Sequence, residues 1–406
     1  MSGERDSAFR QERGLRCIRC FARNADTLLQ KRAAWENAMN FTKTVAATAA
    51  LSMAAGAAIA GGHLANEMTI VSWGGAYSKS QLKAYHEPYS AITGVTILND
   101  DSSSTAVAKL RAMNEAGNIT WDVVDVEAGP AMQLCDEGLA MEIDPDTMLA
   151  RAPNDVSAAE DFGDMLVSDC FIPQIVYSTT FGYRTDLVGD TAPTSVCAVF
   201  DTAAYPGKRS LFSVPINTME WALLCDGVAK SDIYDMLETE EGQNQALAKL
   251  DTIKDDVIWV SSGSDTPQLL ADGEVIMGAT YNGRLFSLIE EQKQPVAMIW
   301  DGQVMDLDGW IIPTGLSPER QARALDYIMF ATDTTRLADQ AKWISYGPAR
   351  KSSAPLVGKH ADLGIDMGPH MPTSPENLSR AFLMNYSFWA DYRDDLDAKF
   401  QAWLAK

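Results

Sequence analysis

Histidine and the motifs of common enzyme classes are scarce in this chain of 406 residues. Its four histidines include no pair spaced as in the zinc-binding motif H-E-x-x-H. The nucleophile motif G-x-S-x-G and the phosphate loop G-x-x-x-x-G-K-[ST] are also absent. We therefore expect no enzyme activity, no catalytic residue, no cofactor and no metal site. A mechanism that uses carboxylates alone, as in a secreted hydrolase, stays open because 55 Asp and Glu residues are present.

Positive charge is also in short supply. Lys and Arg number 33 against 55 Asp and Glu, and the formal net charge is −22. This balance argues against nucleic acid or an anionic lipid surface as a partner. It is compatible with a cationic ligand, although an ordinary solvated acidic surface accounts for most of it.

Cysteine is infrequent, with six in the whole chain. Cys17 and Cys20 form a lone C-x-x-C pair to which we assign no function, because a second pair would be needed for a zinc site. An even number remains after them, which permits two disulfides in three possible pairings, or four buried thiols. These four are Cys135, Cys170, Cys197 and Cys225.

The longest run without charge lies near the start of the chain. Lys43 precedes an Ala-rich apolar run at 45–59, and a small-x-small site at 58–60 suits signal peptidase. The run is shorter than the ~20 residues of a membrane span, so we interpret 39–60 as a signal peptide starting near Met39. The alternative is a buried Ala-rich helix. We expect residues 1–38 to be an upstream extension that is not translated or is disordered.

Beyond the predicted signal peptide, short apolar strands alternate with helical patterns. Strands are predicted at 68–73, 95–98 and 121–126, each followed by a helix-like segment, which predicts a parallel α/β sheet. Further strands are predicted at 257–260, 274–278 and 306–313, and a last amphipathic helix at 376–404. The length suits two lobes rather than one core.

Aromatic and charged residues gather where these predicted strands end, the edge at which open α/β sheets bind ligands. Each has a structural alternative: Trp73 alone suits a core, Asp306 a helix cap, and Arg284 a surface ion pair. Their joint position favours a binding site. The candidate ligand-binding residues are Trp73, Tyr77, Ser103, Glu127, Tyr281, Arg284, Asp306, Asp308 and Tyr346.

Several of these segments, in this order, resemble a known family. The chain is similar to periplasmic solute-binding proteins of ABC importers, close to the spermidine/putrescine-binding group of extracellular solute-binding family 1. The resemblance covers nearly all of 66–406. Its carriers are Ser72-Trp73-Gly74-Gly75-Ala76-Tyr77, Trp121-Asp122-Val123-Val124-Asp125-Val126-Glu127, Gly278-Ala279-Thr280-Tyr281-Asn282-Gly283-Arg284 and Leu307-Asp308-Gly309-Trp310-Ile311-Ile312-Pro313.

The resemblance implies a two-lobed periplasmic-binding-protein fold of type II, with mostly parallel sheets and crossing hinge strands. We expect one lobe from 61–178 and 305–350, and the other from 179–304 and 351–406 with the C-terminal helix. It further implies a periplasmic monomer that closes on a small ligand and delivers it to an inner-membrane permease, without inserting into the membrane. A sensory protein that hands the ligand to a receptor is a further alternative.

The implied ligand is an amine, and two positions bear on its identity. By resemblance, Trp73 lines the cleft, Asp308 receives an ammonium group and Tyr346 lies near the pocket. Arg284 falls where polyamine binders place a second acid, and Met219 falls near where they place a glutamate. We therefore expect a polyamine such as spermidine or putrescine first. The alternative is a zwitterionic ω-amino acid such as γ-aminobutyrate, whose carboxylate suits Arg284.

Overall fold

The structure is a computed structural model that describes residues 66–406, which belong to one compact unit, His63–Lys406. The predicted upstream extension at 1–38 and the predicted signal peptide at 39–60 lie outside the described residues. Among residues 66–406, no helix has the length and apolar character needed to cross a bilayer.

A mixed eleven-stranded sheet connects the whole unit. Eight strands form its main path in the order β2-β1-β3-β9-β4-β7-β5-β6, while β8 and β10 pair with β4 and β11 pairs with β9. The strands are β1 Glu67–Val71, β2 Thr96–Asp100, β3 Val123–Glu127, β4 Ile172–Arg184, β5 Arg209–Phe212, β6 Val257–Val260, β7 Met277–Tyr281, β8 Val296–Met298, β9 Val304–Ile311, β10 Gly347–Pro348 and β11 Phe382–Leu383.

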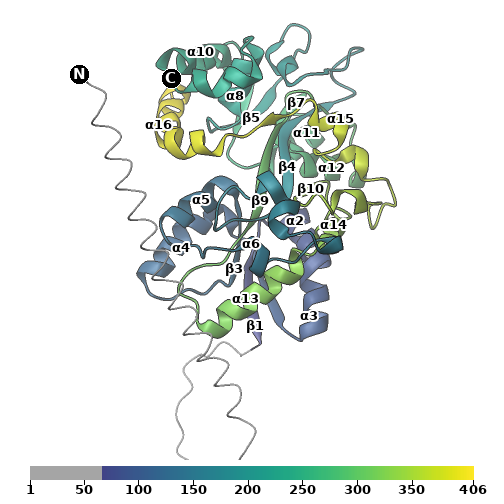
Figure 1. Cartoon of the computed structure of the whole chain (residues 1–406). Helices are drawn as coiled ribbons and strands as arrows, with labels where there is room; N and C mark the ends of the chain where they lie inside the picture. The colour runs from purple at the N-terminus through teal and green to yellow at the C-terminus, as the bar shows by residue number, and fades with distance from the viewer. Residues whose placement is uncertain (1–65) are drawn as a thin grey trace, which may run out of the picture. The chain divides into compact units, whose positions relative to one another are not determined.

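The two ends of this sheet are parallel and its centre is antiparallel. At one end β1 pairs in parallel with β2 and β3, and at the other β5 pairs in parallel with β6 and β7. Between them β9 runs antiparallel to both β3 and β4, and β4 runs antiparallel to β7. The long strands β4 and β9 thus join two parallel wings, as Figure 1 shows.

Helices cover both wings (Figure 1). The wing around β1 carries α3, α4, α5 and α13, and the wing around β5 carries α8, α10 and α16. The helices are α2 Gly75–Gln81, α3 Glu87–Thr93, α4 Ala106–Glu115, α5 Ala128–Asp136, α6 Pro145–Met148, α7 Ala158–Phe162, α8 Thr218–Cys225, α9 Ile233–Leu237, α10 Glu240–Asp251, α11 Asp265–Asp272, α12 Asn282–Phe286, α13 Pro318–Ala331, α14 Thr334–Gln340, α15 Pro375–Leu378 and α16 Tyr386–Leu404.

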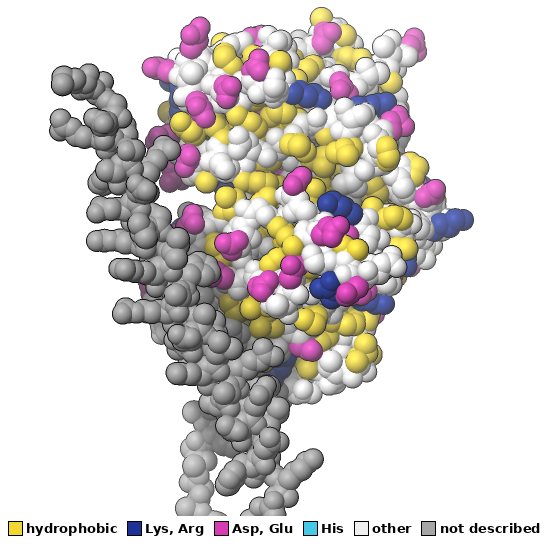
Figure 2. Space-filling view, in the orientation of Figure 1, with side chains coloured by type: hydrophobic (Ala, Val, Ile, Leu, Met, Phe, Trp, Pro, Cys, Tyr) yellow, Lys and Arg dark blue, Asp and Glu magenta, His cyan; other side chains and the backbone are white. Residues whose placement is uncertain are grey.

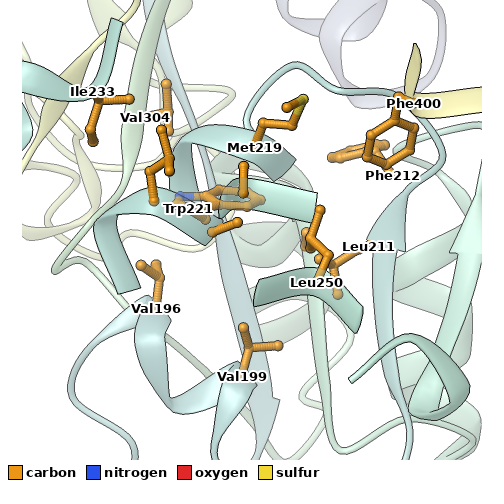
Figure 3. Packing of buried hydrophobic residues seen from close by; sticks show 14 of the residues in the cluster. Val196, Val199, Leu211, Phe212, Met219, Trp221, Ile233, Leu250, Val304 and Phe400 are labelled. Carbon is orange, nitrogen blue, oxygen red and sulfur yellow. The ribbon is translucent and has the colours of Figure 1, made fainter. Parts of the chain in front are cut away.

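Each wing has its own hydrophobic core, which is the physical basis of two lobes. In the lobe around β5, Trp221 lies among Leu211, Met219 and Leu250 (Figure 3). In the lobe around β1, a separate cluster contains the fully buried Trp310. The assignment of the chain ranges 61–178 with 305–350, and 179–304 with 351–406, to these lobes stays a prediction.

All four cysteines of the described part are paired. Cys135 at the end of α5 joins Cys170, and Cys197 joins Cys225 at the end of α8. The bonds close loops with sequence separations of 35 and 28 residues. The sequence left three pairings open, and the fold selects this one because each pair lies within reach of a disulfide.

Acidic side chains are spread over the visible face of the molecule and do not form one patch (Figure 2). This distribution agrees with a solvated acidic surface as the main source of the net charge of −22.

Two predicted elements are displaced. The strand predicted at 274–278 lies at Met277–Tyr281, so that Tyr281 ends the strand instead of following it. The helix predicted at 376–404 is divided into α15 and α16 by the short strand β11. The later start of strand β7 has a local cause. Gly273 ends α11 in the left-handed conformation, and the backbone N–H groups of Glu274 and Val275 donate to the carbonyl of Leu269 in that helix.

Candidate functional site

The turn that follows β1 places two aromatic rings at the edge of the sheet. Gly74 and Gly75 both have positive φ, at 79° and 60°, which side chains with a Cβ rarely adopt. The chain therefore turns sharply after Trp73 and enters α2, whose third residue is Tyr77. Trp73 is half-buried and Tyr77 is 6% exposed.

Four carboxyl groups lie close together on the central strands. Asp125 and Glu127 are two apart on β3, and Asp306 and Asp308 are two apart on β9, so each pair points to one face of its strand. Glu127 lies directly opposite Asp308 in the antiparallel register. Like charges in this position destabilise a sheet, so the arrangement costs stability unless protons or a cation neutralise it.

Asp125 is the best-enclosed member of this carboxyl cluster. It is fully buried and accepts hydrogen bonds from Trp73 Nε1 at 3.2 Å and Tyr77 OH at 3.1 Å, and another from Gln81 Nε2. Burial raises the pKa of Asp125 to about 7, although these hydrogen bonds and one from Asp308 act to lower it. Burial and the charge of Asp125 raise the pKa of Asp308 well above its usual range, so Asp308 holds the proton shared by the pair.

Tyr177 connects the other two carboxyl groups. Its hydroxyl oxygen lies 3.0 Å from Glu127 Oε1 and 2.9 Å from Asp306 Oδ2. One hydroxyl has one proton to donate, so the second contact requires a protonated carboxyl or is unfavourable. Burial, together with the charge of Glu127, raises the pKa of Asp306 to about 7, and burial raises that of Glu127.

Aromatic rings enclose the space in front of these carboxyls. Tyr346 lies 5.9 Å from Tyr77 and 6.1 Å from Tyr177, and Tyr177 lies 5.5 Å from Tyr281, between ring centroids. Gly283 allows this closeness, because a Cβ there would come within 2.6 Å of the Tyr346 ring. A cation in this space would contact the carboxyl groups of Glu127 and Asp308 and the faces or edges of several rings.

Arg284 supplies the opposite charge at the same site. It belongs to the short helix α12, and its guanidinium carbon lies 5.7 Å from the centre of the Tyr281 ring. Among residues 66–406, no carboxylate oxygen lies within 4 Å of its nitrogens. Its fork of donors is therefore available to an anionic group of a ligand.

Seven of the nine candidate residues line one cavity, here called the cleft cavity, whose volume is about 530 Å³ when the space at its open mouth is included. They are Trp73, Tyr77, Glu127, Tyr281, Arg284, Asp308 and Tyr346. Asp306 lines a neighbouring cavity instead. Ser103 is 5% exposed and its backbone N–H donates to Ser72, so the structure does not bring its side chain into either cavity.

Sequence reasoning missed Asp125 and Tyr177 as site residues. Asp125 lies inside a predicted strand, where its alternation with Glu127 was the available signal; Tyr177 lies in β4, a strand that was not predicted.

Met219 belongs to the hydrophobic core (Figure 3). Its neighbour Glu220 is 1% exposed, receives a hydrogen bond from Trp389 Nε1, and has a pKa raised by burial to about 8. Neither lines the two cavities.

Comparison with known proteins gives consistent matches over most of the chain. A family profile described as bacterial extracellular solute-binding protein matches residues 84–373. The γ-aminobutyric acid-binding protein of Pseudomonas aeruginosa PAO1 is 33% identical over 339 residues, which cover 84% of this chain and 91% of that protein.

Solved structures give the same picture. The Atu4243-GABA receptor is 30% identical with a TM-score of 0.70, covering 84% of this chain and 98% of that one. MotA from A. tumefaciens B6, in complex with glucopine, is 27% identical with a TM-score of 0.72, covering 83% and 99%. The spermidine/putrescine-binding protein PotD of Streptococcus pneumoniae, 15% identical with a TM-score of 0.63 over 84% and 99%, shares the fold. These matches confirm the predicted two-lobed type II fold.

Proposed function

Because the chain belongs to the bacterial extracellular solute-binding proteins, we propose that it captures a zwitterionic ω-amino acid of the γ-aminobutyrate type for an ABC transporter. The relatives reported above are solute-binding proteins and not enzymes. Binding takes place in the cleft cavity, and the lobes close over the ligand about the crossing strands β4 and β9. The closed form then delivers the ligand to the permease outside the cytoplasm.

The observation that carries this proposal is that Arg284, which has no carboxylate partner within residues 66–406, lines the same cavity as Glu127 and Asp308. A carboxylate at one end of the ligand pairs with the guanidinium through two hydrogen bonds. An ammonium group at the other end donates to the carboxylates and lies against Trp73, Tyr77 and Tyr346. Both ends of the ligand are then neutralised.

A polyamine fits this cavity less well, which reverses the order that the sequence suggested. A diamine needs an acid at each end, and Arg284 repels the ammonium that reaches it. The glutamate that polyamine binders place near position 219 is not available either, because Met219 is in the core and Glu220 is hydrogen bonded to Trp389. The relatives named for γ-aminobutyrate are at 30–33% identity, against 15% for the spermidine/putrescine binder.

A thermal-shift comparison tests the proposed ligand class. A ligand at a hundredfold excess over its Kd stabilises the folded protein by about 2.7 kcal/mol, so a bound ligand raises Tm measurably. We expect γ-aminobutyrate to raise Tm, and butyrate and butylamine, which each carry one of its two charges, to leave Tm nearly unchanged. A rise with putrescine or spermidine and none with γ-aminobutyrate would overturn the proposal.

A further inference from the structure

A second cavity lies next to the cleft cavity and shares three residues with it. Its volume is about 690 Å³ when the space at its open mouth is included, and the shared residues are Glu127, Tyr177 and Tyr281. Of the carboxylates in the cluster, Glu127 is the one common to both cavities, while Asp308 lines the first and Asp306 the second. An ammonium group bound to Glu127 therefore lies at the junction of two spaces.

The second cavity also has an arginine in its wall. Arg393 projects from α16, and its charge acts on Glu127, where it opposes the rise in pKa caused by burial. Its Nε lies 3.8 Å from Asp397 Oδ2, a long ion pair, and the Arg393 side chain is 47% exposed. Asn217, which is 8% exposed, adds an amide oxygen that has no hydrogen-bond partner among residues 66–406. The carboxyl cluster thus has an arginine in each adjoining cavity, Arg284 in the first and Arg393 in the second.

Amine chemistry decides what such a pair of cavities can hold. A primary ammonium group has one carbon arm, so γ-aminobutyrate occupies the cleft cavity and leaves the second cavity to water. A secondary ammonium group has two carbon arms and keeps two N–H donors, enough for Glu127 and one further carboxylate. Its second arm can then lie in the second cavity, which Tyr386 and Trp389 help to line.

Building on the proposed function, we propose that the cleft accepts N-substituted ω-amino acids, with the second arm in the second cavity and its terminal carboxylate on Arg393. The ligand class is a secondary amine that carries one carboxylate on each arm. The two arginines pair with the two carboxylates, and the carboxyl cluster receives the ammonium between them.

The test compares three probes by isothermal titration calorimetry on the purified protein. They are γ-aminobutyrate, N-methyl-γ-aminobutyrate and N-(2-carboxyethyl)-γ-aminobutyrate. The last two are both secondary amines and differ by the second carboxylate. We expect the carboxyethyl probe to bind at least about tenfold more tightly than the methyl probe, as a charge-assisted pair provides.

Two variants locate the effect. Arg393→Ala should abolish the tenfold preference for the carboxyethyl probe over the methyl probe, and Ile216→Trp, which fills the second cavity, should exclude the carboxyethyl probe. Lys399→Ala is the matched control, because it removes a positive charge from α16 outside both cavities. A preference that survives Arg393→Ala, or equal affinity of the wild-type protein for both secondary amines, overturns the inference.

The outcomes for the two proposals are separable. If γ-aminobutyrate binds while the carboxyethyl probe gains nothing from Arg393, the further inference fails and the proposed function stands. If γ-aminobutyrate fails to bind while the carboxyethyl probe binds through Arg393, the cleft prefers the two-armed class and the assignment of a simple ω-amino acid fails.

Discussion

Replacing Arg284 by alanine separates the two ligand classes most sharply. No carboxylate within residues 66–406 lies within 4 Å of this guanidinium, so its removal breaks no ion pair in that part of the chain. Truncating one partner of an enclosed charge pair costs about 2–5 kcal/mol. Since Arg284 is half-buried, we take the lower part of that range, about 2–3 kcal/mol, which weakens γ-aminobutyrate about 30- to 150-fold.

A diamine responds in the opposite direction to the same change. Two like unit charges about 6 Å apart repel by about 3 kcal/mol at an effective dielectric constant of 20, and solvent and salt reduce this further. With about 1 kcal/mol left after screening, Arg284→Ala should strengthen putrescine binding severalfold. The affinities for γ-aminobutyrate and putrescine thus change in opposite directions, which a general loss of folding cannot imitate.

Isothermal titration calorimetry of both ligands against wild type and variants measures these changes. Arg284→Lys keeps the charge and loses the planar fork, so it should restore γ-aminobutyrate binding only in part. Lys293→Ala is the control of equal charge change, because Lys293 lies outside the cleft cavity and its side chain is 66% exposed. Unchanged γ-aminobutyrate affinity in Arg284→Ala, or a larger loss for putrescine, would refute the role given to Arg284.

Three further predictions concern the ring, the acids and the disulfides. Trp73→Ala should weaken γ-aminobutyrate and putrescine alike, by about 0.5–2 kcal/mol for the lost cation–π contact; unchanged affinity in calorimetry would return the indole to a purely structural role. The pKa of Asp125 is raised to about 7, so the folded protein holds a proton that the unfolded chain loses near pH 4. Without ligand, the stability of the wild-type protein relative to Asp125→Asn should therefore fall as pH rises from about 4 to about 7. The affinity for γ-aminobutyrate should rise over the upper part of that range, because binding needs the ionised carboxylates. A difference in Tm between the two proteins that does not change with pH contradicts the stability prediction. Replacing both Cys135 and Cys170 by alanine should lower the free energy of unfolding by about 3–4 kcal/mol, as expected for a loop closed over 35 residues; a loss below about 1 kcal/mol in urea unfolding argues against the entropic origin.

Much of the α/β fold could be predicted from local pattern. Strands β1, β3 and β6 lie within two residues of the predicted ranges, because each is a short segment rich in apolar and β-branched residues and bounded by polar or turn residues. The long strand β4 was not predicted. It contains Pro173 and Gly182, which suggest a break, and polar residues such as Thr180 that are buried only because neighbouring strands cover them.

The lining of the cleft cavity was predictable where side chains follow a strand end. Trp73, Tyr77 and Arg284 belong to that class, and each lines the cleft cavity. Ser103 belongs to it as well, but the chain after β2 turns its side chain into the protein. Position at a strand end therefore indicates the right edge of the sheet without deciding which way each side chain points.

The sequence by itself determined the composition of the site: aromatic rings, several acids and one arginine placed by turns such as Gly74-Gly75. Only the tertiary structure decided which of the many acids act together. Asp125 and Glu127 meet Asp306 and Asp308 because β3 and β9 pair in antiparallel register, although they are far apart in the chain. The pairing of β3 with β9 brings the four carboxyl groups together, and the packing of α12 and α16 brings Arg284 and Arg393 to the two adjoining cavities. No local pattern encodes these features, because each depends on what packs against it from elsewhere in the chain.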